Sequence, residues 1–369
     1  MAKLLTAIGL MSGTSMDGID VALLRTDGER AVERGPARSY PYADGVRRTL
    51  RTALAEAVEL QARDARPGSL AEVETAITEL HAAAVKSFID ENRPADGLDV
   101  IGFHGQTVLH RPEARLTVQL GDGALLARLT GCKVVSDLRA ADVEAGGQGA
   151  PLVPVYHRAL ASRLPQRPVV FVNIGGVANV TWIGEEGDLL AFDTGPGNAL
   201  MDDWALRCTG NPCDAEGALA RSGVPDDRVL REYLMHPYFG EPVPKSLDRG
   251  SFTLEPLEGL DPATGAATLA HCTAISVAHA ASWFKAPPAL WVICGGGRRN
   301  RFLMELLAWH LDAPVVPAEA IGLDGDGLEA EAWAYLAVRS LRGLPITFPS
   351  TTGVPEPLRG GVLHRPSEN

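Results

Sequence analysis

The feature that most constrains the fold of this chain is a pattern of strands and helices that runs through it twice. Each half begins with three short strand-like runs in direct succession, and helical stretches and further strands follow them. Strands interleaved with helices are typical of layered α/β proteins. The repetition therefore predicts a duplicated α/β architecture.

The expected elements are assigned from hydrophobic period and flanking turn residues. In the first half, strands are expected at 4–10, 19–26, 31–40, 99–103, 116–120 and 133–136, and helices at 45–59, 70–92 and 121–129. In the second half, strands are expected at 167–174, 178–183, 188–192 and 289–294, and helices at 197–207, 216–222, 227–235, 263–284, 300–310 and 328–341. The segment 347–369 is rich in Pro, Gly and Thr and is expected to be a loosely packed surface tail.

Chain length sets the number of domains. A chain of 369 residues is too long for one ordinary core, so two domains are expected. We assign residues 1–137 plus 342–369 to the N-terminal domain and residues 138–341 to the C-terminal domain.

Composition argues against several classes of partner and compartment. With 34 Lys and Arg against 46 Asp and Glu, the formal net charge is −12, which disfavours nucleic acid and anionic membranes as partners. No apolar run approaches the roughly 18 residues of a membrane helix, and the apolar start leads directly into a glycine motif, as a first strand would. The 5 cysteines are scattered and odd in number, which predicts a reducing, cytoplasmic location without a zinc site.

The first of three glycine loops, GLMSGTSMDGID, connects two expected strands and is therefore a hairpin. Gly13, Thr14, Ser15 and Gly18 can direct backbone N–H groups and hydroxyls toward one anion. Asp17 and Asp20 are expected to hold a hydrated Mg²⁺ beside it.

Two further glycine loops follow strands in the second half. NIGGVANV, from Asn173 to Val180, lies between two strands, and CGGGRRN, from Cys294 to Asn300, lies between a strand and a helix. Each loop alone is also typical of an ordinary tight turn, and none has the spacing of a P-loop or dinucleotide-binding motif. Together they predict a nucleotide held between two hairpin loops and covered by the third.

These loops resemble those of the actin, hexokinase and Hsp70 superfamily, which implies two RNase H-like domains with a central ATP and substrate cleft. In more detail the chain resembles the anhydro-N-acetylmuramic acid kinase family. The matching stretches are GLMSGTSMDGID, GFHGQTVLH, AGGQGAPLVP, VNIGGVANV, FDTGPGNALMDDW and CGGGRRN. They extend from residue 9 to residue 300, and the segment around Glu329 extends the resemblance to nearly the whole chain.

The resemblance implies roles for the residues of the three loops. ATP phosphates are expected to be bound by Gly13, Thr14, Ser15, Met16, Asp17, Gly18, Ile19, Asp20, Gly175 and Gly176. The adenosine is expected near Gly295, Gly296, Gly297 and Asn300. The wider superfamily has an Asp two residues before a glycine in its first loop, where this chain has Gly9 and Leu10, so the carboxylate that serves Mg²⁺ stays open between Asp17 and Asp20.

Asp193 ends an expected strand and precedes a sharp Thr-Gly-Pro-Gly turn into a helix. A carboxylate at a strand end beside phosphate loops is placed as a general base, although the same residue type also suits the N-cap of the following helix. The resemblance makes Asp193 the catalytic base. It implies that Asp193 activates a water that attacks the anomeric carbon of a 1,6-anhydro sugar, whose bridging oxygen is captured by the γ-phosphoryl group.

Sugar contacts are expected from residues of both expected domains. His104, Gln106 and Thr107 follow a buried strand and are assigned to the substrate, with a polar turn as the alternative. Arg139 is expected to meet a substrate carboxylate or to form an interdomain salt bridge. The resemblance makes Glu329 a substrate-side carboxylate. The stretch PKSLDRGSF follows the family's PKSTGRE pattern only in part, which leaves the role of Arg249 open.

The resemblance implies an ATP-dependent kinase that hydrolytically opens 1,6-anhydro-N-acetylmuramic acid and phosphorylates O6 in cell-wall recycling. The products are N-acetylmuramic acid 6-phosphate and ADP, and the family implies a homodimer. One alternative is a kinase for another 1,6-anhydro sugar such as levoglucosan. A second alternative, from another class, is a non-catalytic ATP-gated protein of the actin or Hsp70 type.

Overall fold

The structure is a computed structural model that describes residues 3–13, 16–94 and 97–366. The chain divides into two compact units, which are called unit 1 (residues 1–162 and 327–369) and unit 2 (residues 163–326). The units differ from the expected domains, because segments 138–162 and 327–341 group with unit 1. Whether the expected domains act as separate bodies stays a prediction.

Unit 1 contains a mixed seven-stranded sheet with the order β12-β6-β4-β1-β2-β3, and β5 pairs with β4 outside this path. β2 is antiparallel to both β1 and β3, whereas β4 is parallel to β1 and to β6. The strands are β1 (Leu5–Ser12), β2 (Gly18–Thr26), β3 (Val32–Pro41), β4 (Val100–Arg111), β5 (Leu116–Leu120), β6 (Val134–Ser136) and β12 (Val362–His364).

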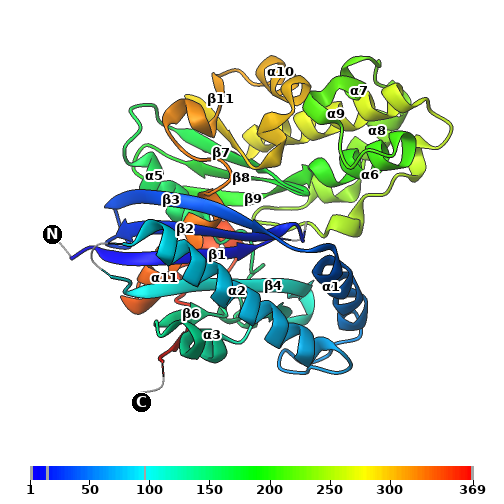
Figure 1. Ribbon diagram of the computed structural model, residues 1–369. Helices are drawn as coiled ribbons and strands as arrows, with labels where there is room; N and C mark the ends of the chain where they lie inside the picture. The colour runs from blue at the N-terminus through cyan, green and yellow to red at the C-terminus, as the bar shows by residue number, and fades with distance from the viewer. Residues whose placement is uncertain (1–2, 14–15, 95–96, 367–369) are drawn as a thin grey trace. The chain divides into compact units, whose positions relative to one another are not determined.

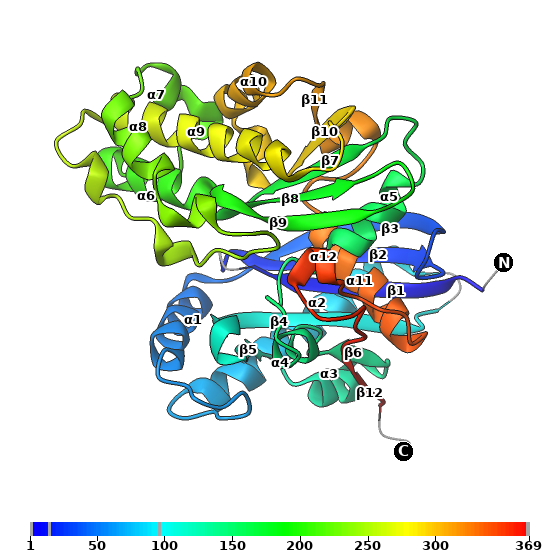
Figure 2. The ribbon, with the colours of Figure 1, turned by 180° about the vertical axis from the view of Figure 1, so that it is seen from behind.

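Helices α2 and α11 cover opposite faces of this sheet, as Figures 1 and 2 show from the two sides. The core on the α2 face contains Ile77, Val85 and Phe88, all at most 1% exposed. The helices of unit 1 are α1 (Asp44–Ala57), α2 (Leu70–Asn92), α3 (Gly123–Thr130), α4 (Ala140–Glu144), α5 (Pro154–Ala161), α11 (Leu328–Leu341) and α12 (Pro349–Thr352). α11 joins unit 1 because it packs on β1, β2 and β4.

Unit 2 contains a five-stranded sheet with the order β11-β10-β7-β8-β9. β8 is antiparallel to β7 and β9, whereas β10 is parallel to β7 and β11. Its strands are β7 (Val169–Ile174), β8 (Val177–Ile183), β9 (Leu189–Pro196), β10 (Leu290–Cys294) and β11 (Val315–Pro317), and its helices are α6 (Asn198–Thr209), α7 (Ala218–Arg221), α8 (Asp227–Leu234), α9 (Pro262–His279) and α10 (Arg301–His310).

The core of unit 2 lies between its sheet and the long helix α9, which packs on β8 and β9 (Figure 2). The face of α9 that contains Ala266, Ala270 and Val277 is almost fully buried. Small side chains on this face allow the helix to approach the sheet closely. A single apolar cluster connects this face with the strands.

The same strand order occurs in both units. An antiparallel meander (β1-β2-β3 or β7-β8-β9) is extended on its first strand by two parallel strands (β4 and β6, or β10 and β11). This is the RNase H-like arrangement, so the expected duplicated α/β fold is confirmed.

Two local expectations were wrong. The strand expected at 99–103 continues to Arg111, so His104, Gln106 and Thr107 lie in a strand and not in a turn. The tail is not loosely packed throughout: β12 pairs antiparallel with β6, and the Thr352 hydroxyl donates to Asp142 Oδ2 at 2.6 Å. Among the residues that the structure describes, no helix is long and apolar enough to cross a membrane.

Candidate active site

The first glycine loop connects β1 and β2 in unit 1. Met11 pairs with Asp20 at the loop end of the hairpin, and the Met16 N–H donates to the Gly13 carbonyl at 3.1 Å. Met16 adopts a φ of 54°, a left-handed value that tight turns require. Gly18, Ile19 and Asp20 begin β2. Thr14 and Ser15, which were also expected to bind phosphate, lie outside the described residues.

Buried polar side chains form hydrogen bonds that hold this loop in place. Gln106 donates from Nε2 to the Gly13 carbonyl at 3.1 Å and accepts the Ser12 hydroxyl at 2.6 Å. The Ser12 and Tyr42 hydroxyls lie 3.0 Å apart, and burial raises the pKa of Tyr42 to about 12. Gln106, expected at the sugar, therefore contacts the first glycine loop, and its role toward the sugar stays a prediction. Tyr42 was missed, because no local pattern distinguishes it from a core tyrosine.

Asp17 and Asp20 provide the carboxylates expected for Mg²⁺. Asp17 is exposed, and its backbone carbonyl accepts the Tyr42 N–H at 2.9 Å, which fixes the backbone before β2. The Asp20 carboxylate accepts a hydrogen bond from Ser39 on β3. Carboxylate oxygens such as those of Asp17 and Asp20 are ligands of the kind that Mg²⁺ prefers. The residues present therefore fit this ion.

His104 and Arg139 form a compact cluster with Trp333. Arg139 donates from Nε to His104 Nε2 at 3.1 Å and from Nη1 to the Gly149 carbonyl at 2.7 Å. Its guanidinium lies 5.1 Å from the centre of the Trp333 ring, and the His104 ring lies 4.5 Å from that ring. Burial, and secondarily the Arg139 charge, hold the pKa of His104 well below its usual value. His104 is therefore neutral and accepts at Nε2, so its ring proton lies on Nδ1.

The other two expected sugar residues are less enclosed. Thr107 accepts the Gln119 amide at 3.2 Å, and Glu329 lies partly exposed in the first turn of α11. Two residues further, Glu331 is only 1% exposed, and its carboxylate accepts Arg34 Nε at 2.8 and 2.9 Å. Sequence reasoning missed this ion pair, because its partner is on a distant strand.

The second and third glycine loops lie against each other in unit 2. The Gly175 carbonyl accepts the Asn198 N–H at 2.7 Å, and the Asn198 side chain donates to the Ile174 carbonyl at 2.9 Å. A Cβ on Gly295 would lie 2.3 Å from Asn173 Oδ1, and one on Gly297 would lie 2.5 Å from Ile174 Cγ2. Glycine is therefore required at 295 and 297, and the start of α6 is hydrogen-bonded to the second loop.

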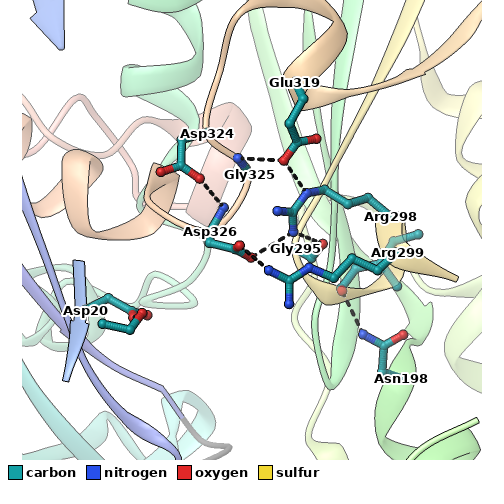
Figure 3. A network of polar contacts seen from close by, with 11 residues as sticks. Asp20, Asn198, Gly295, Arg298, Arg299, Glu319, Asp324, Gly325 and Asp326 are labelled. Carbon is teal, nitrogen blue, oxygen red and sulfur yellow. Dashed lines mark hydrogen bonds and ion pairs between the residues drawn. The ribbon is translucent and has the colours of Figure 1, made fainter. Parts of the chain in front are cut away.

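Arg298 anchors the third glycine loop to the segment that ends unit 2 (Figure 3). Its guanidinium donates to the Gly295 carbonyl at 2.8 Å, to Glu319 at 2.8 Å and to Asp326 at 2.9 Å. Burial alone would raise the pKa of Glu319 and Asp326, but hydrogen bonds from Arg298 hold both below their usual values. Arg298, which sequence reasoning did not single out, thus fixes the backbone at Gly295.

Gly296 and Asn300 complete the expected adenosine loop. A Cβ on Gly296 would lie 3.3 Å from the Asn198 amide, a tight contact that a small shift of this side chain could relieve. Asn300 is the N-cap of α10, where its Oδ1 accepts the Leu303 N–H at 2.9 Å. The structure therefore gives Asn300 a structural contact, and its role toward adenosine stays a prediction.

Asp193 lies near the end of β9 and is 8% exposed. Its Oδ2 accepts the Leu247 N–H at 2.8 Å, and its own N–H donates to the Lys245 carbonyl at 3.0 Å. α6 begins at Asn198 after Gly197, and no side chain caps it, so the alternative of Asp193 as the N-cap was wrong. The contact with Leu247 orients the carboxylate, as a general base requires.

The repeated strand order and the glycine loops at corresponding hairpins define a protein of the actin, hexokinase and Hsp70 type. The sequence profile of the anhydro-N-acetylmuramic acid kinase family matches residues 5–365. A protein of that name from Rhodopseudomonas palustris is 54% identical, with 98% of this chain and 100% of the relative covered. Another, from Rhodospirillum rubrum, is 57% identical over 96% of this chain and 93% of the relative. The chain belongs to the anhydro-N-acetylmuramic acid kinase family.

Among solved structures, a ROK hexokinase from Thermus thermophilus matches with a TM-score of 0.40 and 17% identity. The match covers 92% of this chain and 100% of the hexokinase.

Proposed function

We propose that this enzyme uses ATP to open 1,6-anhydro-N-acetylmuramic acid and to phosphorylate its O6. The products are N-acetylmuramic acid 6-phosphate and ADP, and the reaction belongs to peptidoglycan recycling. The observation that carries the proposal is membership in the kinase family together with Asp193, a nearly buried carboxylate oriented by a backbone N–H at the end of β9.

In this proposal Asp193 is the catalytic base. It accepts a proton from a water that attacks the anomeric carbon, and the bond from that carbon to the bridging oxygen breaks. The released oxygen, now O6, forms its new bond to the γ-phosphorus of ATP, and ADP leaves. The phosphoryl group takes the place of the general acid of ordinary glycoside hydrolysis, so one base is sufficient.

We propose that the phosphates of ATP contact the first and second glycine loops, and the adenosine contacts the third. Asp17 and Asp20 are the residues proposed to hold Mg²⁺, which neutralises phosphate charge when it is bound. The positioning of Gly13 by Gln106 and of Gly295 by Arg298 supports these assignments, because phosphate recognition by backbone N–H groups requires a fixed backbone.

The sugar is proposed to contact His104, Thr107, Arg139 and Glu329. Arg139 can meet a carboxylate only with guanidinium N–H groups other than those bonded to His104 and Gly149. Because its ring is neutral, His104 can provide both an aromatic face and polar ring atoms without adding a positive charge.

A panel of anhydro sugars tests the substrate. With Mg-ATP we expect ADP release to rise strongly with 1,6-anhydro-N-acetylmuramic acid and only weakly with levoglucosan, which lacks the N-acetyl and lactyl groups. Phosphorus NMR should show a sugar 6-phosphate. Equal stimulation by levoglucosan would favour the alternative substrate, and ATP binding without stimulation by any sugar would favour the non-catalytic alternative.

The family resemblance further leads us to propose a cytoplasmic homodimer. Analytical ultracentrifugation at micromolar protein concentration tests the dimer: a species of twice the 39.1 kDa chain mass is expected. A species of the single-chain mass at all concentrations would contradict it.

A further inference from the structure

One segment of unit 2 closes around Asp193. This segment, residues 238–247, is called the base clamp. The Tyr238 hydroxyl at its beginning donates to the Asp193 carbonyl, and the Leu247 N–H at its end donates to Asp193 Oδ2. Between them, the Lys245 carbonyl accepts the Asp193 N–H. The base clamp therefore contacts the backbone carbonyl, the backbone N–H and the carboxylate of Asp193.

Lys245 ties the two ends of the base clamp together. Its side chain is buried, with the residue 6% exposed, and Nζ donates to the Tyr238 carbonyl at 2.6 Å. Nζ also lies 4.3 Å from the centre of the Tyr238 ring, in cation–π geometry. Burial lowers the pKa of Lys245.

Burying an ammonium group that donates only to carbonyls is costly for a side chain that has no function, and the Glu241 charge offsets only part of that cost, because the pKa of Lys245 stays lowered. The Lys245 ammonium donates to the Tyr238 and Phe239 carbonyls, both within the base clamp. An apolar residue would fill the same space without that cost, but it could not hold these carbonyls. The placement of the cation is therefore explained by the geometry that it imposes on the base clamp.

We propose that Lys245 is a positioning residue for proton abstraction by Asp193. It holds the base clamp closed and thereby keeps the Leu247 N–H on the Asp193 carboxylate, so that the base faces the attacking water in one orientation. This inference rests on the proposed function, because it assigns Lys245 to the step in which Asp193 is the base.

The test is the substitution Lys245→Met, which keeps the length of the side chain and removes the ammonium group. The control is Lys285→Met, the same change at an exposed lysine of unit 2. Turnover is divided by the number of sites that bind ADP, so that misfolded protein does not lower kcat.

For Lys245→Met we expect kcat to fall roughly 10- to 100-fold, as for a base displaced by a fraction of an ångström. KM for ATP and for the sugar should stay within about twofold of wild type. Lys245→Arg, which keeps a cationic donor, should recover part of the loss.

A double-mutant cycle separates positioning from a merely structural role. In an Asp193→Asn background no base remains to be positioned, so Lys245→Met should change the residual turnover by less than about twofold. The same fold loss in both backgrounds, or a rise in KM with kcat unchanged, would overturn the inference. If Lys245→Met does not fold, Tyr238→Phe replaces it, because that change removes only the hydroxyl that contacts Asp193.

Wild-type turnover in the same assay reports on the proposed function separately. Sugar-stimulated turnover with full activity of Lys245→Met would leave the function intact and reject the inference. Absence of wild-type turnover with every sugar would overturn both.

Discussion

Asp193 and Glu331 are both nearly buried carboxylates, yet their surroundings differ. Glu331 receives two hydrogen bonds from Arg34 and one from the Tyr156 hydroxyl at 2.6 Å, which is how a protein stabilises a structural buried charge. Asp193 lies at a strand end and receives a backbone N–H from the base clamp. Glu331 is therefore a structural carboxylate of unit 1, whereas the surroundings of Asp193 leave its carboxylate to the proposed role as a base.

Removing the Glu331 carboxylate should destabilise the protein strongly. Glu331→Ala leaves the partly buried Arg34 guanidinium without this partner, and breaking a buried pair costs about 3–5 kcal/mol. Urea unfolding measures the change in the free energy of unfolding. The matched control is Arg25→Ala, which breaks the exposed Arg25–Glu33 pair and should cost at most about 1 kcal/mol. Equal losses for the two variants would contradict the structural role of Glu331.

The environment of Asp202 leads to a prediction about how the stability of the protein depends on pH. Burial, and secondarily the neighbouring Asp203, raise the pKa of Asp202 to about 6, above its unfolded value of 3.8. The folded state therefore binds this proton more tightly, and stability is lost as pH rises from about 4 to about 6. Asp202→Asn should raise the melting temperature relative to wild type at pH 7.5 and lose this advantage at pH 4. A difference that does not depend on pH would contradict the assignment.

Residue roles were predictable only where a motif carried them. Asp193 and the glycines were predicted as site residues because they lie in short, ordered stretches of sequence. Tyr238 was not singled out, and Lys245 and Leu247 were noted only as part of the PKSLDRGSF stretch, because their contacts with Asp193 are made by tertiary packing. Gln106 was assigned to the sugar, and its bond to the Gly13 carbonyl was not predicted, since that bond depends on the register between β1 and β4.

At the scale of elements, the fit of α11 on β1 and β4 decides the packing of unit 1. Gly9 and Gly102 are paired across these two strands and face α11. A Cβ on Gly9 would lie 1.8 Å from the Ala330 carbonyl oxygen, and one on Gly102 would lie 2.1 Å from the Trp333 carbonyl oxygen. The helix backbone therefore lies directly on the strands, and no side chain fits between them.

Adding one methyl group at this contact should be costly. Gly9→Ala forces α11 away from the sheet, and we expect a loss of about 3 kcal/mol, the upper end for overpacked cores, or more. Gly45→Ala, at the start of α1, has open space and should be neutral or slightly stabilising. Urea unfolding of both variants measures the difference. A loss of less than about 1 kcal/mol for Gly9→Ala would show that the helix can shift freely.

Most elements were predictable, because hydrophobic period and turn residues determine strands and helices locally. The meanders β1-β2-β3 and β7-β8-β9 were expected close to where they lie. The extension of β4 through His104 was not, because polar residues and Gly105, with a φ of 73°, are typical of a turn. The pairing of β12 with β6 was also missed, since a strand as short as Val362–His364 has no detectable period.

At the scale of the whole molecule, the two units differ in how the chain builds them. Unit 2 is continuous from 163 to 326 and contains its own sheet and core, whereas unit 1 needs α11, which comes after unit 2 in the sequence. The expected domain boundaries placed α11 with the second half, because chain order alone does not show that a late helix returns to the first sheet.

This connectivity predicts which fragments fold. Residues 163–326 expressed alone should unfold cooperatively in urea and give a native-like circular dichroism spectrum. Residues 1–162 alone should not, because the glycine surface of β1 and β4 would lack α11. The control joins residues 327–369 to the 1–162 fragment through a flexible linker, which should restore folding. A folded 1–162 fragment would contradict the importance of α11.

The most direct test of the whole account is ADP release from Mg-ATP with and without 1,6-anhydro-N-acetylmuramic acid, for wild type and for Asp193→Asn. The account predicts that the sugar stimulates turnover in the wild type and that the variant binds ATP but loses this stimulation by about 10³-fold or more, as loss of an essential base does. Stimulation that persists in Asp193→Asn would contradict the assignment of the base, and absence of stimulation in the wild type would contradict the substrate.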